Sequence, residues 1–105
     1  MNVVEVCHAL ADPTRLEILK FIRRFSGSPS PCDYPEEYGV CVCHIAEHIG
    51  ITQPRVSYHL KTLKHAGLVQ EVSRGKWSFY SLVTEKFGEL VEYINSQFLT
   101  EEADA

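Results

Sequence analysis

The sequence predicts a mainly α-helical domain that carries one β-hairpin, and two observations indicate this fold class. Apolar residues recur at helical spacing in most of the chain, whereas residues 68–83 are rich in β-branched and aromatic side chains around a glycine-containing turn. With 105 residues, the chain can bury a single hydrophobic core but not two. We therefore expect one domain over residues 1–105.

Two helices are predicted in the N-terminal part of the chain. A short first helix places Val3, Cys7 and Leu10 on one apolar stripe, which should pack against something larger. A cysteine on such a stripe is most often a small core hydrophobe. Asp12 then supplies the N-cap of a second helix, which should end near Phe25.

Residues 26–40 differ abruptly in composition, with glycines and prolines among serines and acidic residues, and we expect a loop there. A connection of this length inside a compact domain is usually functional or disordered. This loop carries Cys32 toward Cys41 and Cys43. We interpret it as a lid or as an arm that supplies a ligand.

The next two predicted helices are joined by a very short turn. The third helix begins around Cys41 and Cys43 and should end at Gly50 in a left-handed conformation. Thr52 caps a fourth helix that runs to about His65. Two helices joined in this way form a helix-turn-helix. The expected inward-facing residues are Val42, Ile45, Ala46 and Ile49 in the third helix and Val56, Leu60 and Leu63 in the fourth.

A hairpin and a final helix complete the chain. The strands flank the basic tip Arg74-Gly75-Lys76, so the helix-turn-helix and the hairpin together predict a winged helix. Thr84 should cap the last helix, whose apolar stripe runs from Phe87 to Phe98. Residues 101–105 are acidic and are expected to be disordered.

Charge is distributed unevenly along the chain. The formal net charge is −4, yet residues 51–76 carry +4 and the remainder carries −8. One basic face on an acidic body is typical of a protein that binds DNA. A winged helix that binds only protein is the alternative.

The N-terminal end of the fourth helix should meet base edges, because this helix enters the major groove in a winged helix. Gln53 and Arg55 suit bidentate base contacts, whereas phosphate contacts suit Thr52, Lys61, Lys64, Arg74 and Lys76. His59 suits either packing or a phosphate contact. The predicted DNA-contacting residues are Thr52, Gln53, Arg55, Ser57, Tyr58, His59, Lys61, Lys64, Arg74 and Lys76.

Five segments together resemble the ArsR/SmtB family of metal-responsive repressors. They are Ala9–Leu16, Cys41–Cys43, Ser57–Leu63, Ala66–Val69 and Arg74–Lys76, and the resemblance covers about residues 3–99. It implies a homodimeric winged-helix repressor that occupies an operator in double-stranded DNA and leaves it when an inducer binds. The apolar stripes of the first and last helices exceed what one small domain can bury, so we expect them to form the dimer.

The Cys-Val-Cys placement is similar to that of arsenite, antimonite and cadmium or lead sensors in this family. Arsenite-sensing members often carry a third cysteine one helical turn later, where this chain has Ala46. Zinc-sensing members bind metal on the last helix through Asp and His, but residues 84–99 contain no histidine. The third ligand must then come from elsewhere. The candidates are Cys32, Cys7, His44 and a thiol of the partner subunit.

Helical geometry constrains the thiol pair. Residues i and i+2 of a regular helix point roughly 200° apart, so Cys41 and Cys43 can bind one ion only if the first turn deforms or the helix starts late. We expect coordination to distort this helix and so favour a state that does not bind DNA. Three thiolates, Cys41, Cys43 and Cys32, would suit As(III) or Sb(III), whereas four ligands including His44 would suit Zn(II), Cd(II) or Pb(II).

A redox sensor is the main alternative to a metal(loid) sensor. Exposed thiols of low pKa near a partner thiol could instead make a redox sensor. A metal-dependent hydrolase would need clustered carboxylates, or a nucleophile with a matching base, and the sequence offers neither; we do not expect an enzyme. No stretch is apolar enough to span a membrane and no signal peptide precedes the domain, so we expect a cytoplasmic protein with reduced cysteines.

Overall fold

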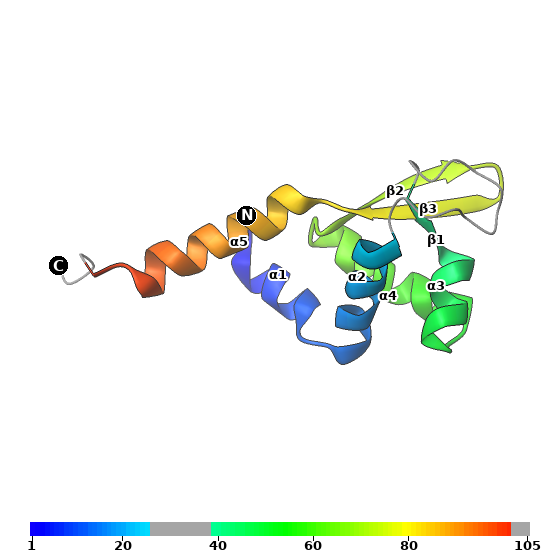
Figure 1. Cartoon of the computed structure of the whole chain (residues 1–105), viewed down its shortest axis with the longest axis horizontal. Coiled ribbons are helices and arrows are strands. Elements are labelled where there is room, and N and C mark those ends of the chain that lie inside the picture. The colour runs from blue at the N-terminus through cyan, green and yellow to red at the C-terminus, as the bar shows by residue number, and fades with distance from the viewer. Residues whose placement is uncertain (26–38, 102–105) are drawn as a thin grey trace.

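The fold is a winged helix-turn-helix whose last helix projects from the body (Figure 1). The computed structural model describes residues 1–25 and 39–101. In chain order the elements are α1 (Val3–Leu10), α2 (Pro13–Phe25), β1 (Val40–Cys41), α3 (Val42–Ile49), α4 (Gln53–His65), β2 (Val69–Arg74), β3 (Trp77–Leu82), α5 (Thr84–Ile94) and a π-helical segment, Asn95–Leu99. The predicted fold class, mainly helical with a hairpin wing, is confirmed.

The core lies between α2, α3, α4 and the base of the hairpin. The expected inner face of α4 is confirmed, since Val56, Leu60 and Leu63 are all 0% exposed. Burial of each such side chain contributes about 1.5–3 kcal/mol. Gly50 ends α3 with φ 84°, the left-handed conformation in which glycine carries no steric penalty, and so sets the short turn into α4.

Side-chain caps fix where two of the helices begin. Asp12 Oδ1 accepts hydrogen bonds from the backbone N–H groups of Thr14 and Arg15, at 2.8 and 3.1 Å, and Thr52 caps α4, as predicted. The expected cap at Thr84 is wrong. The helix already includes Thr84, and Val83 precedes it without a side-chain cap. The reason is that the Val83 N–H donates to the Leu68 carbonyl at 2.9 Å. Hydrogen bonding at the base of the hairpin therefore continues up to the residue before α5.

A two-residue strand, β1, joins the wing to α3 and was not anticipated. The sheet order is β1-β3-β2, with Val40 opposite Tyr80 and Cys41 opposite Phe79. The loop expected over residues 26–40 therefore ends before Val40, because a strand this short leaves no periodic pattern. A Cβ at Gly39, where φ is 109°, would collide with the Tyr80 carbonyl oxygen. Residues 26–38, including Cys32, and residues 102–105 lie outside the described residues.

The buried face of α1 differs from the expected one. Val6 and Ala9 are each 1% exposed, whereas Cys7 is exposed. The prediction that Cys7 fills the core is therefore wrong: α1 is held by its Val6 and Ala9 face, which leaves Cys7 beside a groove of about 850 Å³. The apolar residues that line this groove between α1 and the C-terminal arm are Val3, Val4, Cys7, Ala11, Leu90, Tyr93, Ile94 and Phe98.

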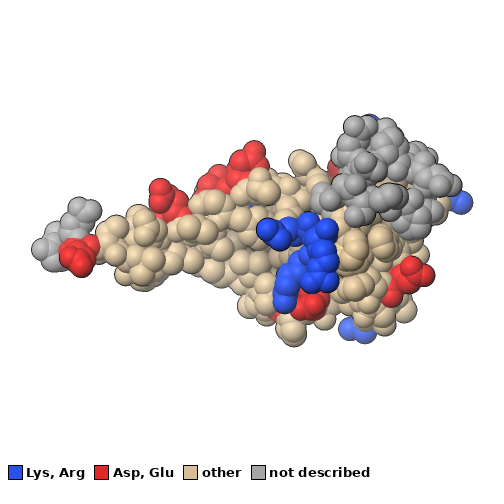
Figure 2. Space-filling model, in the orientation of Figure 1, with Lys and Arg blue, Asp and Glu red and all other residues tan. Residues whose placement is uncertain are grey.

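The C-terminal arm, formed by α5 and the π-helical segment, buries none of its residues. It extends the molecule to 55 Å along its longest axis, against 24 and 19 Å across (Figure 1). Acidic side chains lie along the upper edge of this arm, while lysine and arginine gather on the body in the same view (Figure 2). Among the described residues, no helix has the length and apolar character that crossing a membrane requires.

Candidate DNA-binding surface and thiol site

Helix α4 presents its polar residues on the side opposite its buried face. Gln53, Arg55, Ser57 and Lys61 are all exposed, and Tyr58 is 65% exposed. Thr52 is exposed as well, at the N-cap. The N-terminal half of α4 therefore offers amide, guanidinium, hydroxyl and phenol groups to solvent, as an element that enters a DNA groove would.

The wing tip carries two exposed cations. Arg74 and Trp77 are the last paired residues of the hairpin, so Gly75 and Lys76 form the turn between them. Gly75 has φ 61°, which suits glycine at a tight hairpin turn. Lys76 Nζ lies 5.3 Å from the centre of the Trp77 ring, a cation–π contact that orients the ammonium group without neutralising it.

The ammonium group of Lys64 forms an ion pair within the protein. Its Nζ lies 2.9 Å from Glu71 Oε1, which links α4 to β2. The hydrogen bond from Lys64 is the main cause that lowers the pKa of Glu71. Burial, together with Glu71, raises the pKa of Tyr80 to about 12. Lys64 therefore links α4 to the wing, and its ammonium group already has a carboxylate partner within the protein.

His59 points inward, and its position favours packing over a DNA contact. It is 8% exposed, and its Nδ1 lies 3.2 Å from Arg15 Nη1, which is itself buried. Arg15 Nε also donates to the Ala9 carbonyl at 2.6 Å, and Nη2 to the His8 carbonyl at 3.3 Å. Arg15 thus ties the end of α1 to α2 and α4. Burial lowers the pKa of His59, and nearby Asp12 partly opposes this effect.

We expect this histidine to make the fold sensitive to mild acid. A neutral His59 accepts from Arg15, and the unfolded chain binds a proton more readily, so stability should fall as pH drops below the ordinary histidine pKa of about 6.5. The loss is at most about 1.4 kcal/mol per pH unit for one proton. Urea unfolding at pH 7.5 and 5.5 would measure it. His59→Gln keeps an acceptor that does not titrate, and should show a smaller difference between the two pH values; an equal difference would contradict this role.

The two cysteines converge without any distortion of α3. Cys41 is extended, with φ −81° and ψ 152°, and serves as the N-cap of a helix that begins at Val42. Its Sγ accepts from the His44 N–H at 3.4 Å and lies 2.7 Å from Cys43 Sγ. Of the two geometries that the spacing allows, a late helix start is therefore the one observed. The geometric reason for expecting ion binding to distort α3 therefore does not apply to this structure.

The thiol pair lies against the wing. Cys41, 1% exposed, pairs with Phe79 of β3, and Cys43 and Trp77 pack against these two residues. Side chains alternate between the faces of a strand, so Trp77 and Phe79 share one face of the sheet while Tyr80 faces the main core. The thiols thus belong to a small separate cluster at the junction of α3 and the wing.

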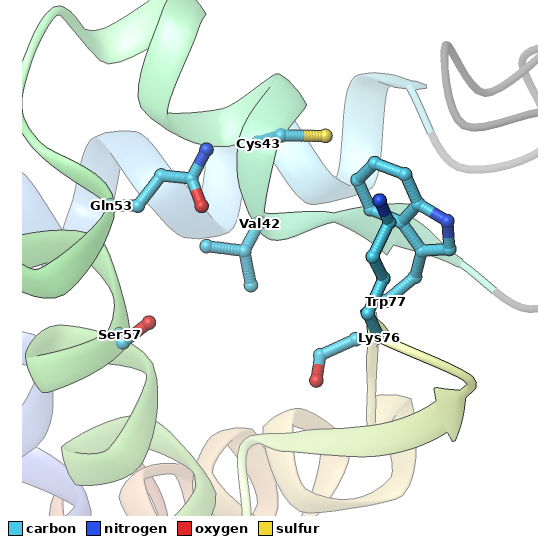
Figure 3. A pocket seen from close by; sticks show the side chains of 7 residues that line it. Val42, Cys43, Gln53, Ser57, Lys76 and Trp77 are labelled. Atoms are coloured by element: carbon cyan, nitrogen blue, oxygen red, sulfur yellow. The ribbon is translucent and has the colours of Figure 1, made fainter.

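A cavity of about 420 Å³ opens beside this cluster (Figure 3). Its lining residues are Val42, Cys43, Gln53, Ser57, Lys76, Trp77 and Ser78. Gln53 and Ser57 reach it from α4, and Lys76 and Trp77 from the wing (Figure 3). The sequence predicts Cys43 and the DNA-contacting residues as separate features. Residue spacing could not reveal that they share one cavity, nor did it point to Trp77.

Among the described residues, no third Cys, His, Asp or Glu joins the pair to complete a metal site. Cys7 lies on α1 beside the apolar groove. His44 contacts the edge of the Phe21 ring at 5.0 Å, and His48 stacks on the same ring at 4.4 Å. Neither Cys7 nor His44 is therefore placed as the third ligand in this arrangement. The remaining candidate in this chain, Cys32, falls outside the described residues.

Comparison with known proteins agrees with this arrangement. Residues 36–71 match the arsR family of bacterial regulatory proteins. An uncharacterized HTH-type transcriptional regulator of Methanocaldococcus jannaschii is 34% identical over 90% of this chain and 92% of its own length. The arsenical resistance operon repressor of Bacillus subtilis is 35% identical over 79% of this chain and 68% of its own. A probable mercury resistance operon repressor of Streptomyces lividans is 40% identical over 79% and 56%.

Solved structures share the fold. The crystal structure of an ArsR family transcriptional regulator superposes with a TM-score of 0.72 at 21% identity, covering 92% of both chains. The homodimeric winged helix-turn-helix domain of a possible ArsR-family regulator from Mycobacterium bovis gives 0.64 at 26% identity, covering 93% of this chain and 82% of that one. With its recognition helix, its wing and these relatives, the chain belongs to the arsR family of DNA-binding transcriptional regulators.

Proposed function

We propose that this protein is a homodimeric repressor that leaves its operator when a thiophilic metal(loid), As(III) or Sb(III), binds Cys41 and Cys43. The observation that carries the proposal is the convergence of the two sulfur atoms, 2.7 Å apart, at the start of the helix that precedes the recognition helix. Thiolates are the ligands that soft ions prefer. Cys32 is proposed as the third thiolate, because three sulfur ligands suit a trivalent metalloid.

The relatives support this class of inducer. One of them is named for arsenical resistance and another for mercury resistance, and both share more than a third of their aligned residues with this chain. As(III) and Sb(III) are the preferred inducers in this proposal because the proposed site offers three thiols. Cd(II), Pb(II) and Zn(II) remain alternatives if His44 or a partner's side chain adds a fourth ligand.

The DNA-binding part of the proposal rests on the exposed groups of α4 and the wing. Lys61 and Lys76 are exposed and Arg55 faces solvent at the start of α4, whereas the Lys64 charge is paired with Glu71. A two-fold dimer would present two recognition helices. The operator should therefore be an inverted repeat with half-sites about one helical turn, or a small multiple of it, apart.

Alanine substitutions should separate base contacts from phosphate contacts. Arg55→Ala should weaken operator binding by about 1–3 kcal/mol and affect nonspecific DNA less, because a base contact is lost. Lys76→Ala should weaken binding to the operator and to nonspecific DNA alike. It should also lower the salt slope, the slope of log affinity against log salt concentration, by about one unit per subunit. Lys64→Ala, the matched control, should change the slope less, because its charge is already paired. Fluorescence anisotropy at several salt concentrations measures all three, and a salt-independent affinity would overturn the proposed DNA surface.

Titration of the reduced protein tests the inducer. As(III), Sb(III), Cd(II), Pb(II), Zn(II) and Hg(II) are each added while thiolate absorption and operator release are followed together. We expect As(III) and Sb(III) to release DNA at one equivalent per site. Release by Cd(II) or Pb(II) with no response to As(III) would move the function to the divalent sensors, and release by none of them would remove the metal-sensing proposal.

A thiol redox sensor is the second candidate, and the same 2.7 Å separation favours it. Peroxide could oxidise one thiol to a sulfenic acid with release of one water. The other thiol would then attack the sulfenic sulfur, forming a disulfide and releasing a second water. In that case peroxide alone releases the operator, a reductant restores binding, and As(III) has little effect. These outcomes are opposite to those expected for the metalloid sensor.

A further inference from the structure

The cavity that holds Cys43 is also lined by residues proposed to contact DNA. Gln53 and Ser57 border it from the recognition helix, and Lys76 borders it from the wing (Figure 3). In a winged helix, DNA is held by these two elements, one in the major groove and the other on the flanking backbone. DNA held by both elements would therefore lie close to this cavity.

A group added at Cys43 can extend into the same space. Cys41 is 1% exposed and packs against Phe79, whereas Cys43 lines the cavity. In Figure 3 the Cys43 side chain points from α3 toward the ring of Trp77. Cys43 therefore gives the pair access to the cavity that Gln53, Ser57 and Lys76 also line.

The thiols already converge, so ligand binding does not need to rearrange α3. A ligand that leaves α3 unchanged must influence DNA by another route. The volume of about 420 Å³ between α4 and the wing is large enough for an ion with its remaining ligands, and it is bordered by Lys76, whose ammonium group lies over the Trp77 ring. A ligand placed there removes space, and an anionic one also neutralises a cation that DNA needs.

We propose that the ligand of the thiol pair excludes DNA directly, by occupying the cavity of about 420 Å³ between α4 and the wing, which we call the cleft. Cys43 places the ligand in the cleft, and Trp77 forms the wall against which it lies. Inducer and DNA then compete for one space. This inference rests on the proposed function, because it takes the thiol pair as the inducer site.

Labels of different charge on Cys43 test the proposal. The protein is prepared with Cys7→Ser, Cys32→Ser and Cys41→Ser, the last because the neighbouring thiol would displace the label. Methanethiosulfonate reagents then attach a neutral methylthio, an anionic sulfonatoethylthio or a cationic trimethylammonioethylthio group to Cys43, each with release of methanesulfinate. Affinity for a random-sequence duplex is measured against salt concentration.

Direct occupancy predicts that the sign of the charge decides the result. The anionic label should bind DNA at least about tenfold more weakly than the cationic label, since their charges would lie near a phosphate. The anionic label should also lower the salt slope by about one unit per subunit. The neutral label should weaken binding less than the anionic label, because it fills part of the cavity without adding a charge. Emission from Trp77, the sole tryptophan, should change with each label.

The matched control carries Ser96→Cys in a protein whose four native cysteines are replaced by serine. Ser96 lies in the C-terminal arm, which projects away from the wing (Figure 1). The same three labels there should have equal effects on DNA affinity. Equal loss with all three labels on Cys43 would indicate a conformational route, and no change with any would place Cys43 outside the DNA cleft; either result overturns the proposal. Failure of As(III) to release an operator would instead count against the proposed inducer while leaving the charge pattern intact.

Discussion

Cys41→Ser and Cys43→Ser should each bind operator DNA normally and no longer respond to As(III). Loss of one thiolate from the pair should raise the As(III) concentration for half-release by roughly 100-fold or more, because serine is a poor ligand for a soft metalloid. Cys32→Ser should behave in the same way if Cys32 is the third ligand. Release is measured by the anisotropy of a labelled operator during As(III) titration.

The structure indicates why these variants should still fold. At position 41 the sulfur accepts a hydrogen bond from the His44 N–H at the start of α3, and serine is a favoured residue at a helix N-cap. At position 43 the side chain is only half-buried. The core face of α3 is carried instead by Ile45 and Ala46. Equal unfolding midpoints in urea would confirm that only the response has changed.

Cys7→Ser is the matched control, since it removes an exposed thiol on α1 that lies away from the pair. It should retain nearly the full response. Loss of the response in Cys7→Ser together with full induction in Cys32→Ser would move the third ligand to the first helix of one of the subunits. Retained induction in Cys43→Ser would remove the assignment of the whole site.

Ile94→Asp should convert the protein into a monomer that no longer binds its operator. Ile94 is 42% exposed and lines the apolar groove between α1 and the C-terminal arm, where we place the partner subunit. A buried carboxylate there should cost about 3 kcal/mol, which corresponds to roughly a 100-fold weaker dimer. Operator affinity should fall at least as much, because one recognition helix reads only a half-site. Sedimentation measures the mass, and anisotropy measures DNA binding.

The choice of position matters for this experiment. Phe87 and Leu90 belong to the same stripe, but both pack against the main core, so aspartate there would also destabilise the fold of one chain. Gln97→Asp is the matched control: it adds the same charge to the arm at an exposed position that does not line the groove. It should remain dimeric. A dimeric Ile94→Asp protein would place the interface on another surface.

Local patterns in the sequence were sufficient for most of the helices and for the hairpin. The inner face of α4, the αL glycine that ends α3 and the caps at Asp12 and Thr52 follow from spacing and residue type, because helix periodicity and capping depend on neighbours within a few residues. The same patterns misplaced the start of α5 and missed β1. A two-residue strand pairs only through its partner, and that partner lies far away in the sequence.

The sequence by itself also determined the candidate chemistry: a thiol pair beside a basic helix-turn-helix. Only the tertiary structure decided how those groups are used. It turned His59 inward to Arg15, paired Lys64 with Glu71, and exposed Cys7 by burying the opposite face of α1. It also brought Cys43 and Trp77 into one cavity with Gln53 and Ser57 on the exposed side of α4. The physical reason is common to all of these cases. Whether a side chain meets solvent, a charge or another ring depends on which distant elements pack beside it, and the periodicity of one segment contains no information about that neighbour.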